Sequence, residues 1–374
     1  MSFRFTDEQR AFRDEVRGFL ADHPELVPRH QFFHGRGGTT RDLYRAIGER
    51  GWLSLTWPTS AGGLGLSPAY EFLLWDELAY ARAARPDLGP GIVASTIHAH
   101  GTPEQQDRFL PGIRSGTTGF ALGYSEPEAG SDLGSVRTRA TLDGDVYLVT
   151  GEKRWTSDAH NATYLWLLCR TGDLASRGRG LSLLILDLSL PGVTIRPIPT
   201  IDGHRLNEVF LDDVPVPVTD RIGPEGGAWA LMREALALER HLQLLPGRVR
   251  RDFDDLRAWT RRTRVDGQDR VRERLAGLAV DVAEVESEVL VTLGAIESGG
   301  DAPVSAARAK LLGSALTQRI AAVGMELGAP SMLDDDEDLA FLWSQAVMET
   351  IAGGTSEIMR GLLARQVFGL GATA

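Results

Sequence analysis

The sequence predicts an α+β fold in which a middle antiparallel β domain separates an N-terminal helical domain from a C-terminal helical bundle. Three observations predict it: apolar residues at helical spacing in the first and last parts, short β-rich runs between them, and no alternation of strands with helices. A doubly wound dinucleotide-binding fold would need that alternation. With 374 residues the chain is too long for one compact core, and we expect domains at residues 1–116, 117–222 and 223–374.

The first domain is predicted to be helical because its apolar residues recur every three or four positions from Thr6 to about Arg114. They include Phe12, Val16, Phe19, Leu20, Leu43, Ile47, Phe72, Leu73 and Leu78. The stretch Gly62-Gly63-Leu64-Gly65 lacks the third glycine and the preceding strand of a dinucleotide-binding loop. We therefore interpret it as a plain turn.

The middle domain is predicted from short runs of β-branched and apolar residues. The stretch ATLDGDVYLVTG indicates a hairpin closed by Asp143-Gly144, because Asp-Gly is a preferred two-residue hairpin turn. Further strands are expected in TYLWLLCR, LSLLILDL, VTIRPI and NEVFLDD. The only cysteine, Cys169, lies in the first of these four runs, which predicts a buried thiol and excludes disulfides within the chain.

The last domain is predicted to consist of long helices from Trp229 onward. We expect one continuous helix over residues 231–245, and a charged helix or linker over residues 251–274. Near the C-terminus, Gly353-Gly354 stops one helix and Thr355 starts another.

Composition excludes several classes of function. The formal net charge of −11 argues against nucleic acid as a partner. No apolar run approaches the roughly 20 residues that a membrane span needs, and the first residues lack the pattern of a targeting peptide, so a cytoplasmic location is expected. The histidine pairs His30 with His34 and His98 with His100 have no evident third ligand, and no metal site is expected.

Three stretches in the three predicted domains carry a resemblance to a known family. They are GYSEPEAGSD at residues 123–132, GEKRWTS at 151–157 and IAGGTSEIMRGLLAR at 351–365. In this order they resemble the signatures of the acyl-CoA dehydrogenase family of flavoproteins. The stretches FTDEQRAFRDEVRGFL, WPTSAGGLGLS and GHRLNEVFLDDVPVP extend the resemblance over nearly the whole chain. It implies the acyl-CoA dehydrogenase fold, FAD as cofactor and an acyl-CoA substrate.

The resemblance also implies which residues hold the cofactor. Trp155 would offer an apolar face to the flavin ring, and the hydroxyls of Ser125 and Ser157 would bond to its edge. Main-chain groups of turns and of a helix N-terminus would approach its polar parts. The full set of expected FAD-binding residues is Tyr124, Ser125, Gly130, Ser131, Trp155, Ser157, Thr355 and Glu357.

The family's reaction removes a proton from Cα of the thioester and passes a hydride from Cβ to flavin N5. Many members carry the catalytic glutamate at the position of Gly353. Others, similar to isovaleryl- and long-chain dehydrogenases, carry it in a Leu-Glu-Arg context that matches Leu238-Glu239-Arg240, so Glu239 is expected to be the base, with Glu349 in reserve. The resemblance further assigns the Gly353 N–H to the thioester carbonyl, and Ser131 and Arg240 to substrate binding.

The resemblance implies an electron-transfer flavoprotein as acceptor and a homo- or heterotetramer. Two alternatives remain open. In the first, the chain is a non-catalytic partner subunit of a mixed tetramer. The absence of a glutamate at Gly353 and of an Arg-x-x-Phe-Gly segment favours this alternative. In the second, it is a flavoenzyme acting on an acyl group bound to a carrier protein. The length, branching and ring character of the acyl group do not follow from any linear motif.

Overall fold

The chain forms two compact units. Unit 1 comprises residues 1–32, 67–85 and 240–374, and unit 2 comprises residues 33–66 and 86–239. The computed structural model describes residues 3–27, 41–84, 86, 88–202, 205–238, 240–328 and 337–371. The boundaries expected at residues 116 and 222 stay a prediction. Among the helices in the described ranges, none combines the length and the apolar character that crossing a bilayer requires.

Unit 2 is built on an eight-stranded sheet in the order β6-β7-β3-β2-β4-β5-β8, with β1 beside β4. Its strands are β1 (Phe120–Gly123), β2 (Arg139–Asp143), β3 (Val146–Lys153), β4 (Tyr164–Arg170), β5 (Leu181–Asp187), β6 (Val193–Pro199), β7 (Arg205–Pro217) and β8 (Arg221–Ile222). The expected hairpin is confirmed, but Asp143 still pairs with Val146, so the two-residue turn is Gly144-Asp145 rather than Asp143-Gly144, with Gly144 at a φ of +63°. The sheet is mixed rather than purely antiparallel, because β1 and β2 pair with β4 in parallel. Strand direction is set by the connections between strands, which the apolar pattern does not report.

Both faces of the central strands are buried, which explains the unbroken apolar run TYLWLLCR. Trp166 and Leu168 of β4 pack in a core with helices of unit 2, whereas Leu165, Leu167 and Cys169 pack in a second core with β3 and β7. The prediction that Cys169 is a buried thiol is confirmed. Burial raises the pKa of this thiol to about 12.

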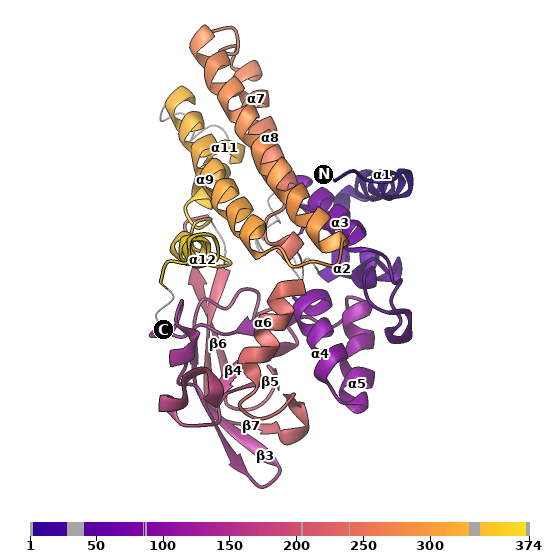
Figure 1. Cartoon of the computed structure of the whole chain (residues 1–374), viewed down its shortest axis with the longest axis vertical. Coiled ribbons are helices and arrows are strands. Elements are labelled where there is room, and N and C mark those ends of the chain that lie inside the picture. Colours follow the sequence, from indigo (N-terminus) through magenta and orange to yellow (C-terminus); the bar gives the residue numbers. More distant parts are fainter. Residues whose placement is uncertain are drawn as a thin grey trace. The chain divides into compact units, whose positions relative to one another are not determined.

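Helical segments of unit 2 share a core with one face of this sheet. They are a π-helical turn (Gly89–Val93), α4 (Ala94–His100), α5 (Pro103–Arg114) and α6 (Ala228–Leu238), of which α6 lies along the sheet in Figure 1. Helix α2 (Arg41–Glu49) contacts the Trp52–Ser54 turn instead. Short 3-10 turns of the unit are Trp52–Ser54, Thr59–Ala61, Leu133–Ser135, Leu174–Gly180 and Val218–Asp220. The stretch from Gly62 to Gly65 is a tight turn, because a Cβ on Gly63 would stand 2.3 Å from the carbonyl oxygen of Trp57.

Unit 1 is helical throughout its described part. Its helices are α1 (Asp7–Asp22), α3 (Pro68–Tyr80), α7 (Pro246–Arg262), α8 (Asp269–Glu297), α9 (Pro303–Gly328), α11 (Glu337–Ala346) and α12 (Ser356–Phe368), with 3-10 turns at Pro24–Leu26 and η9 (Arg240–Leu242). The long helices α8 and α9 lie side by side and share a core with α7 and α11 (Figure 1). Ion pairs join α3 and the residues just after it to α7: Arg82 lies 2.9 Å from Asp252 in a buried pair, and the half-buried Arg250 lies 2.6 Å from Asp76.

The helix expected over residues 231–245 is interrupted. Helix α6 ends at Leu238, η9 spans Arg240–Leu242, and α7 starts only at Pro246. Leu245 is extended, with φ −103° and ψ 110°, as the residue before a proline prefers. The prediction of one continuous helix was therefore wrong, and Leu242 and Gln243 do not follow Glu239 along a single α-helix.

Candidate functional site

The turn after β3 presents the tryptophan that was expected to face a flavin. Trp155 has a φ of +62°, a left-handed conformation that bulky residues rarely adopt, and its side chain is 51% exposed. The Arg154 guanidinium lies over the ring, 4.8 Å from its centroid. Strained backbone of this kind persists where its surroundings hold it, and it gathers at functional sites.

A buried ion pair holds this turn against the loop that follows β1. Lys153 is completely buried, and its ammonium lies 2.8 Å from the Glu126 carboxylate and donates to the carbonyl of Tyr124 at 3.2 Å. The Glu126 carboxylate also accepts from the main-chain N–H groups of Arg137 and Thr138, at 2.7 and 2.8 Å. Burial opposes its charge, but Lys153 and these donors outweigh burial and lower the pKa of Glu126.

The residues of this face fit a flavin. The N–H of Arg154 donates to the carbonyl of Ser125 at 2.9 Å, which brings the 124–126 loop beside the Trp155 turn. Within the described residues, the hydroxyls of Ser125 and Ser157 make no hydrogen bond, so both stay available to a ligand. A Cβ on Gly130 would meet nothing within 4 Å, so the space beside that turn is open. The Tyr124 hydroxyl, by contrast, accepts from the Trp166 indole at 3.1 Å.

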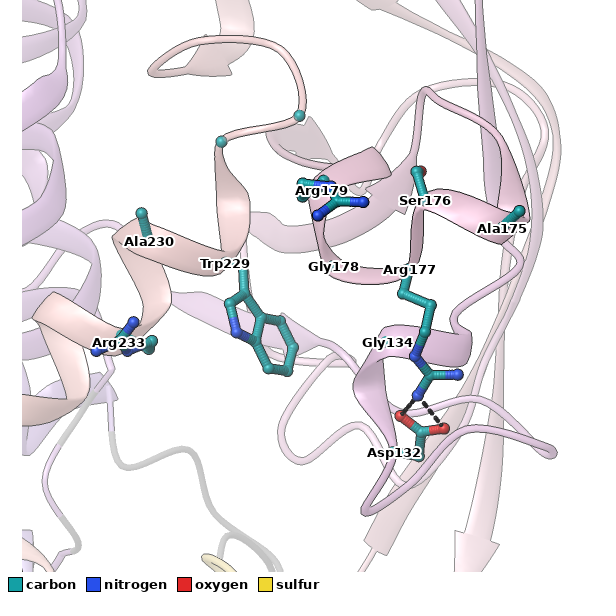
Figure 2. A pocket seen from close by; sticks show the side chains of 12 residues that line it. Asp132, Gly134, Ala175, Ser176, Arg177, Gly178, Arg179, Trp229, Ala230 and Arg233 are labelled. Carbon is teal, nitrogen blue, oxygen red and sulfur yellow. Dashed lines mark hydrogen bonds and ion pairs between the residues drawn. The ribbon is translucent and has the colours of Figure 1, made fainter. Parts of the chain in front are cut away.

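A cationic pocket of about 600 Å³ lies elsewhere in unit 2, between the Leu174–Gly180 turn and the start of α6 (Figure 2). Its lining includes Arg177, Arg179 and Arg233, opposed by one carboxylate, that of Asp132. Figure 2 shows the Trp229 indole between Arg233 and the Arg177–Asp132 pair. The sequence analysis missed this pocket, because Asp132 and Arg233 lie far along the chain from Arg177 and Arg179.

Close backbone approaches build the pocket. A Cβ on Gly178 would stand 3.1 Å from the ring of Trp229, and a Cβ on Gly226 would stand 2.6 Å from the carbonyl oxygen of Arg179. Arg177 has a φ of +50°, and its guanidinium reaches Asp132 at 2.6 Å. Among the described residues, the side chains of Arg179 and Arg233 have no hydrogen-bond or ion-pair partner. Two cations, an indole and the N–H groups that open α6 therefore face one space.

The turn expected before the last helix is confirmed in unit 1, but Gly353-Gly354 does not stop the preceding helix, because α11 already ends at Ala346. Gly353 and Gly354 have φ values of +65° and +97°, and Thr355 caps α12 by accepting from the N–H of Ile358. A Cβ on Gly353 would meet nothing within 4 Å. The main-chain N–H of Gly353 donates to no residue in the described part of the chain. Glu357 is exposed and lies 3.2 Å from Arg360.

The reserve candidate for the base, Glu349, is bound in a buried cluster. Its carboxylate pairs with Arg248, and its main-chain carbonyl accepts from the Lys310 ammonium at 3.0 Å. All three residues are buried. A carboxylate fixed by a guanidinium is stabilised in its charged form and is a poor proton acceptor, so this environment counts against Glu349 as the base.

The preferred candidate for the base lies outside the described residues. Nothing is described of Glu239, nor of the Arg240 side chain. The segment that follows belongs to unit 1, where Gln243 lies 3.7 Å from the sulfur of Met359 in α12. The side chain of Leu244 packs against Gly313 of α9, where an added Cβ would stand only 2.3 Å from it. These contacts bring the chain after Glu239 beside the start of α12.

We expect Lys153→Met to cost about 3–5 kcal/mol of unfolding free energy, because it leaves the buried Glu126 carboxylate without its counter-ion. Urea unfolding measures the loss. The double variant Lys153→Met with Glu126→Gln recovers part of it, since no buried charge remains unpaired and the single amide oxygen still accepts from one of the two N–H groups of Arg137 and Thr138. A loss below about 1 kcal/mol in the single variant contradicts this account of the pair.

Comparison with known proteins agrees with this geometry. Models of the acyl-CoA dehydrogenase N-terminal, middle and C-terminal domains match residues 6–117, 121–214 and 226–368. The acyl-CoA dehydrogenase IpdE1 of Mycobacterium tuberculosis is 37% identical, over 96% of this chain and 97% of that protein.

Two solved structures are similar over almost the whole chain. The Tcur3481-Tcur3483 steroid ACAD has a TM-score of 0.92 at 30% identity and covers 99% of both chains. The ChsE4-ChsE5 complex from Mycobacterium tuberculosis has a TM-score of 0.91 at 31% identity and covers 100% of both. The chain therefore belongs to the acyl-CoA dehydrogenase family, whose members are FAD flavoproteins that oxidise acyl-CoA.

Proposed function

We propose that this chain desaturates an acyl-CoA thioester between Cα and Cβ, with Glu239 as the base. The observation that carries the proposal is the open, left-handed turn at Gly353. It offers a free main-chain donor and an empty side-chain position, while the neighbouring Glu349 is held by Arg248. The base must then come from another segment, and the chain after Glu239 lies beside this turn's helix.

In this proposal each residue has one task. The Glu239 carboxylate takes the proton from Cα. The Gly353 N–H donates to the thioester carbonyl oxygen and stabilises the negative charge that develops there. FAD, when bound, supplies the hydride acceptor. Trp155, Ser125 and Ser157 orient the ring of this cofactor. The Gly130-Ser131 turn and the N-terminus of α12, with Thr355 and Glu357, approach its polar parts.

We further propose that the cationic pocket binds the nucleotide end of coenzyme A. That end carries an adenine and three phosphate groups. The Trp229 indole suits the base, and Arg179, Arg233 and the N–H groups at the start of α6 suit the phosphates. The pocket thus favours a coenzyme A thioester over a carrier-protein thioester, which lacks the adenosine and its 3′-phosphate. Ser131 and Arg240 remain proposed contacts to the substrate.

We expect Glu239→Gln to retain FAD and to lose turnover by about 10³-fold, because the amide cannot take the Cα proton. The measurement is anaerobic bleaching of the flavin band by short, branched, long and ring-bearing acyl-CoA thioesters. Ring-bearing thioesters come first, since the similar Tcur3481-Tcur3483 protein is a steroid ACAD. Glu234→Gln, on the exposed side of α6, is the matched control. A Glu239→Gln variant with near wild-type bleaching removes this assignment.

We expect Arg179→Met and Arg233→Met each to raise KM for acyl-CoA about tenfold and to leave kcat unchanged, because a charge-assisted bond to the phosphates is lost in ground and transition state alike. Steady-state kinetics with acyl-CoA and with the acyl-pantetheine thioester, which lacks the nucleotide, separate the effects. The variants match wild type on acyl-pantetheine. Arg139→Met, an exposed change on β2 outside the pocket, controls for loss of charge. Equal losses on both substrates contradict the pocket assignment.

We propose that the working enzyme is an oligomer, either a homotetramer or a mixed one, with an electron-transfer flavoprotein as acceptor. The names of the two similar structures each join two proteins. In α12 and just after it, exposed apolar side chains extend over Ile358, Val367, Phe368 and Leu370. Contact with another subunit would remove this apolar surface from water.

We expect Phe368→Glu to lower the mass of the purified protein in light scattering, because it places a charge on a side chain that is 70% exposed in the single chain. Gln366→Glu adds the same charge two residues earlier and leaves the mass unchanged. A monomeric wild type with stoichiometric FAD contradicts the oligomer. A colourless wild type that takes up FAD only with a second dehydrogenase chain supports the partner-subunit alternative.

A further inference from the structure

Asn207 of β7 is completely buried and binds the turn that carries Trp155. The N–H of Thr156 donates to the carbonyl of Asn207 at 3.0 Å, and the N–H of Asn207 donates back at 3.0 Å. The Asn207 side chain adds a third bond, from Nδ2 to the same Thr156 carbonyl at 2.9 Å. The residue directly after Trp155 is therefore fixed to the sheet by three hydrogen bonds.

The neighbours of Asn207 determine which way its amide points. Oδ1 accepts from Arg205 Nε at 2.9 Å, and an arginine only donates. Nδ2 faces the Thr156 carbonyl, which only accepts, and His160 Nδ1 at 3.3 Å. Burial, and then the charge of Arg205, lower the pKa of His160. Both polar atoms of this amide have partners, and an aspartate would still accept from Arg205 but could not donate to the Thr156 carbonyl.

We infer that Asn207 is a positioning residue for the flavin, acting through Thr156 to hold the Trp155 indole and the Ser157 hydroxyl in place. The inference rests on the proposed FAD site. Trp155 needs external support because its φ of +62° is unfavourable for a bulky residue. The support comes from both sides of the turn. The N–H of Arg154 bonds to Ser125 before Trp155, and Asn207 bonds to Thr156 after it.

The inference separates two roles that one residue could have. A purely structural asparagine would affect stability alone. A positioning residue also changes the surroundings of the bound flavin, and so its affinity and its fluorescence, which a stacked indole quenches. Both quantities, the affinity for FAD and the flavin fluorescence, are measured on the resting protein with FAD and without any thioester. The substrate and the identity of the base therefore do not enter the test.

The test is Asn207→Asp, which keeps the acceptor for Arg205 but turns an oxygen toward the Thr156 carbonyl. We expect a folded protein whose dissociation constant for FAD rises about tenfold, with brighter flavin fluorescence. The control is Asn161→Asp, the same change at the chain's other asparagine, whose Nδ2 lies 2.8 Å from Asp158 Oδ1 and 3.1 Å from His160 Nε2 and, among the described residues, makes no hydrogen bond with Thr156. It introduces a charge beside the same histidine, and we expect wild-type affinity and fluorescence.

Two outcomes overturn the inference. One is a folded Asn207→Asp protein that binds FAD with wild-type affinity and fluorescence. The other is an equal change in Asn161→Asp. If Asn207→Asp does not fold, the Arg205→Met variant tests the inference instead, because it frees the Asn207 amide to rotate without burying a charge. It should weaken FAD binding about threefold, and an unchanged value overturns the inference. A wild-type protein that binds FAD but bleaches with no thioester contradicts only the proposed reaction.

Discussion

The face of unit 2 that presents Trp155 depends on one buried ion pair, between Lys153 and Glu126. A charged group removed from water is costly unless a partner and hydrogen bonds replace its hydration, and here the carboxylate is surrounded by an ammonium and two main-chain N–H groups. Neither segment can move away without leaving a charge unpaired. The loop after β1 and the turn after β3 therefore form one rigid support, on which the strained turn at Trp155 is held.

The two lysines of the chain have the same structural task in different units. Of 40 basic residues only Lys153 and Lys310 are lysine, and both are buried. Each ammonium donates to the main-chain carbonyl of a loop, that of Tyr124 or that of Glu349. A compact ammonium on a flexible stem reaches such a carbonyl in a narrow space, whereas a planar guanidinium needs more room and more acceptors. Arginine serves at the surface and in carboxylate pairs, and the buried Arg170 donates to four main-chain carbonyls rather than one.

Much of the fold could be predicted because burial leaves a periodic pattern, as in the strands on either side of Gly144-Asp145. Pro246, whose ring disfavours helical backbone at Leu245, marks the end of the segment expected to be helical, but it does not predict the earlier end of α6 at Leu238. The parallel pairing of β1 and the cationic pocket could not be predicted. The first depends on how the chain crosses the sheet. The second brings Asp132, Arg177 and Arg233 together from separate segments, and no local spacing reports such an arrangement.

In the proposed reaction, the glycine at position 353 fits with a base on another segment. Space does not exclude a larger residue, since a Cβ there would meet nothing within 4 Å. The backbone conformation disfavours a larger residue, because a φ of +65° costs a residue with a side chain about 1 kcal/mol, whereas glycine adopts this angle freely. A turn shaped by two left-handed glycines presents its N–H groups but is a poor place for a glutamate. A carboxylate from the chain before η9 would leave this turn unstrained and free to bind the thioester carbonyl.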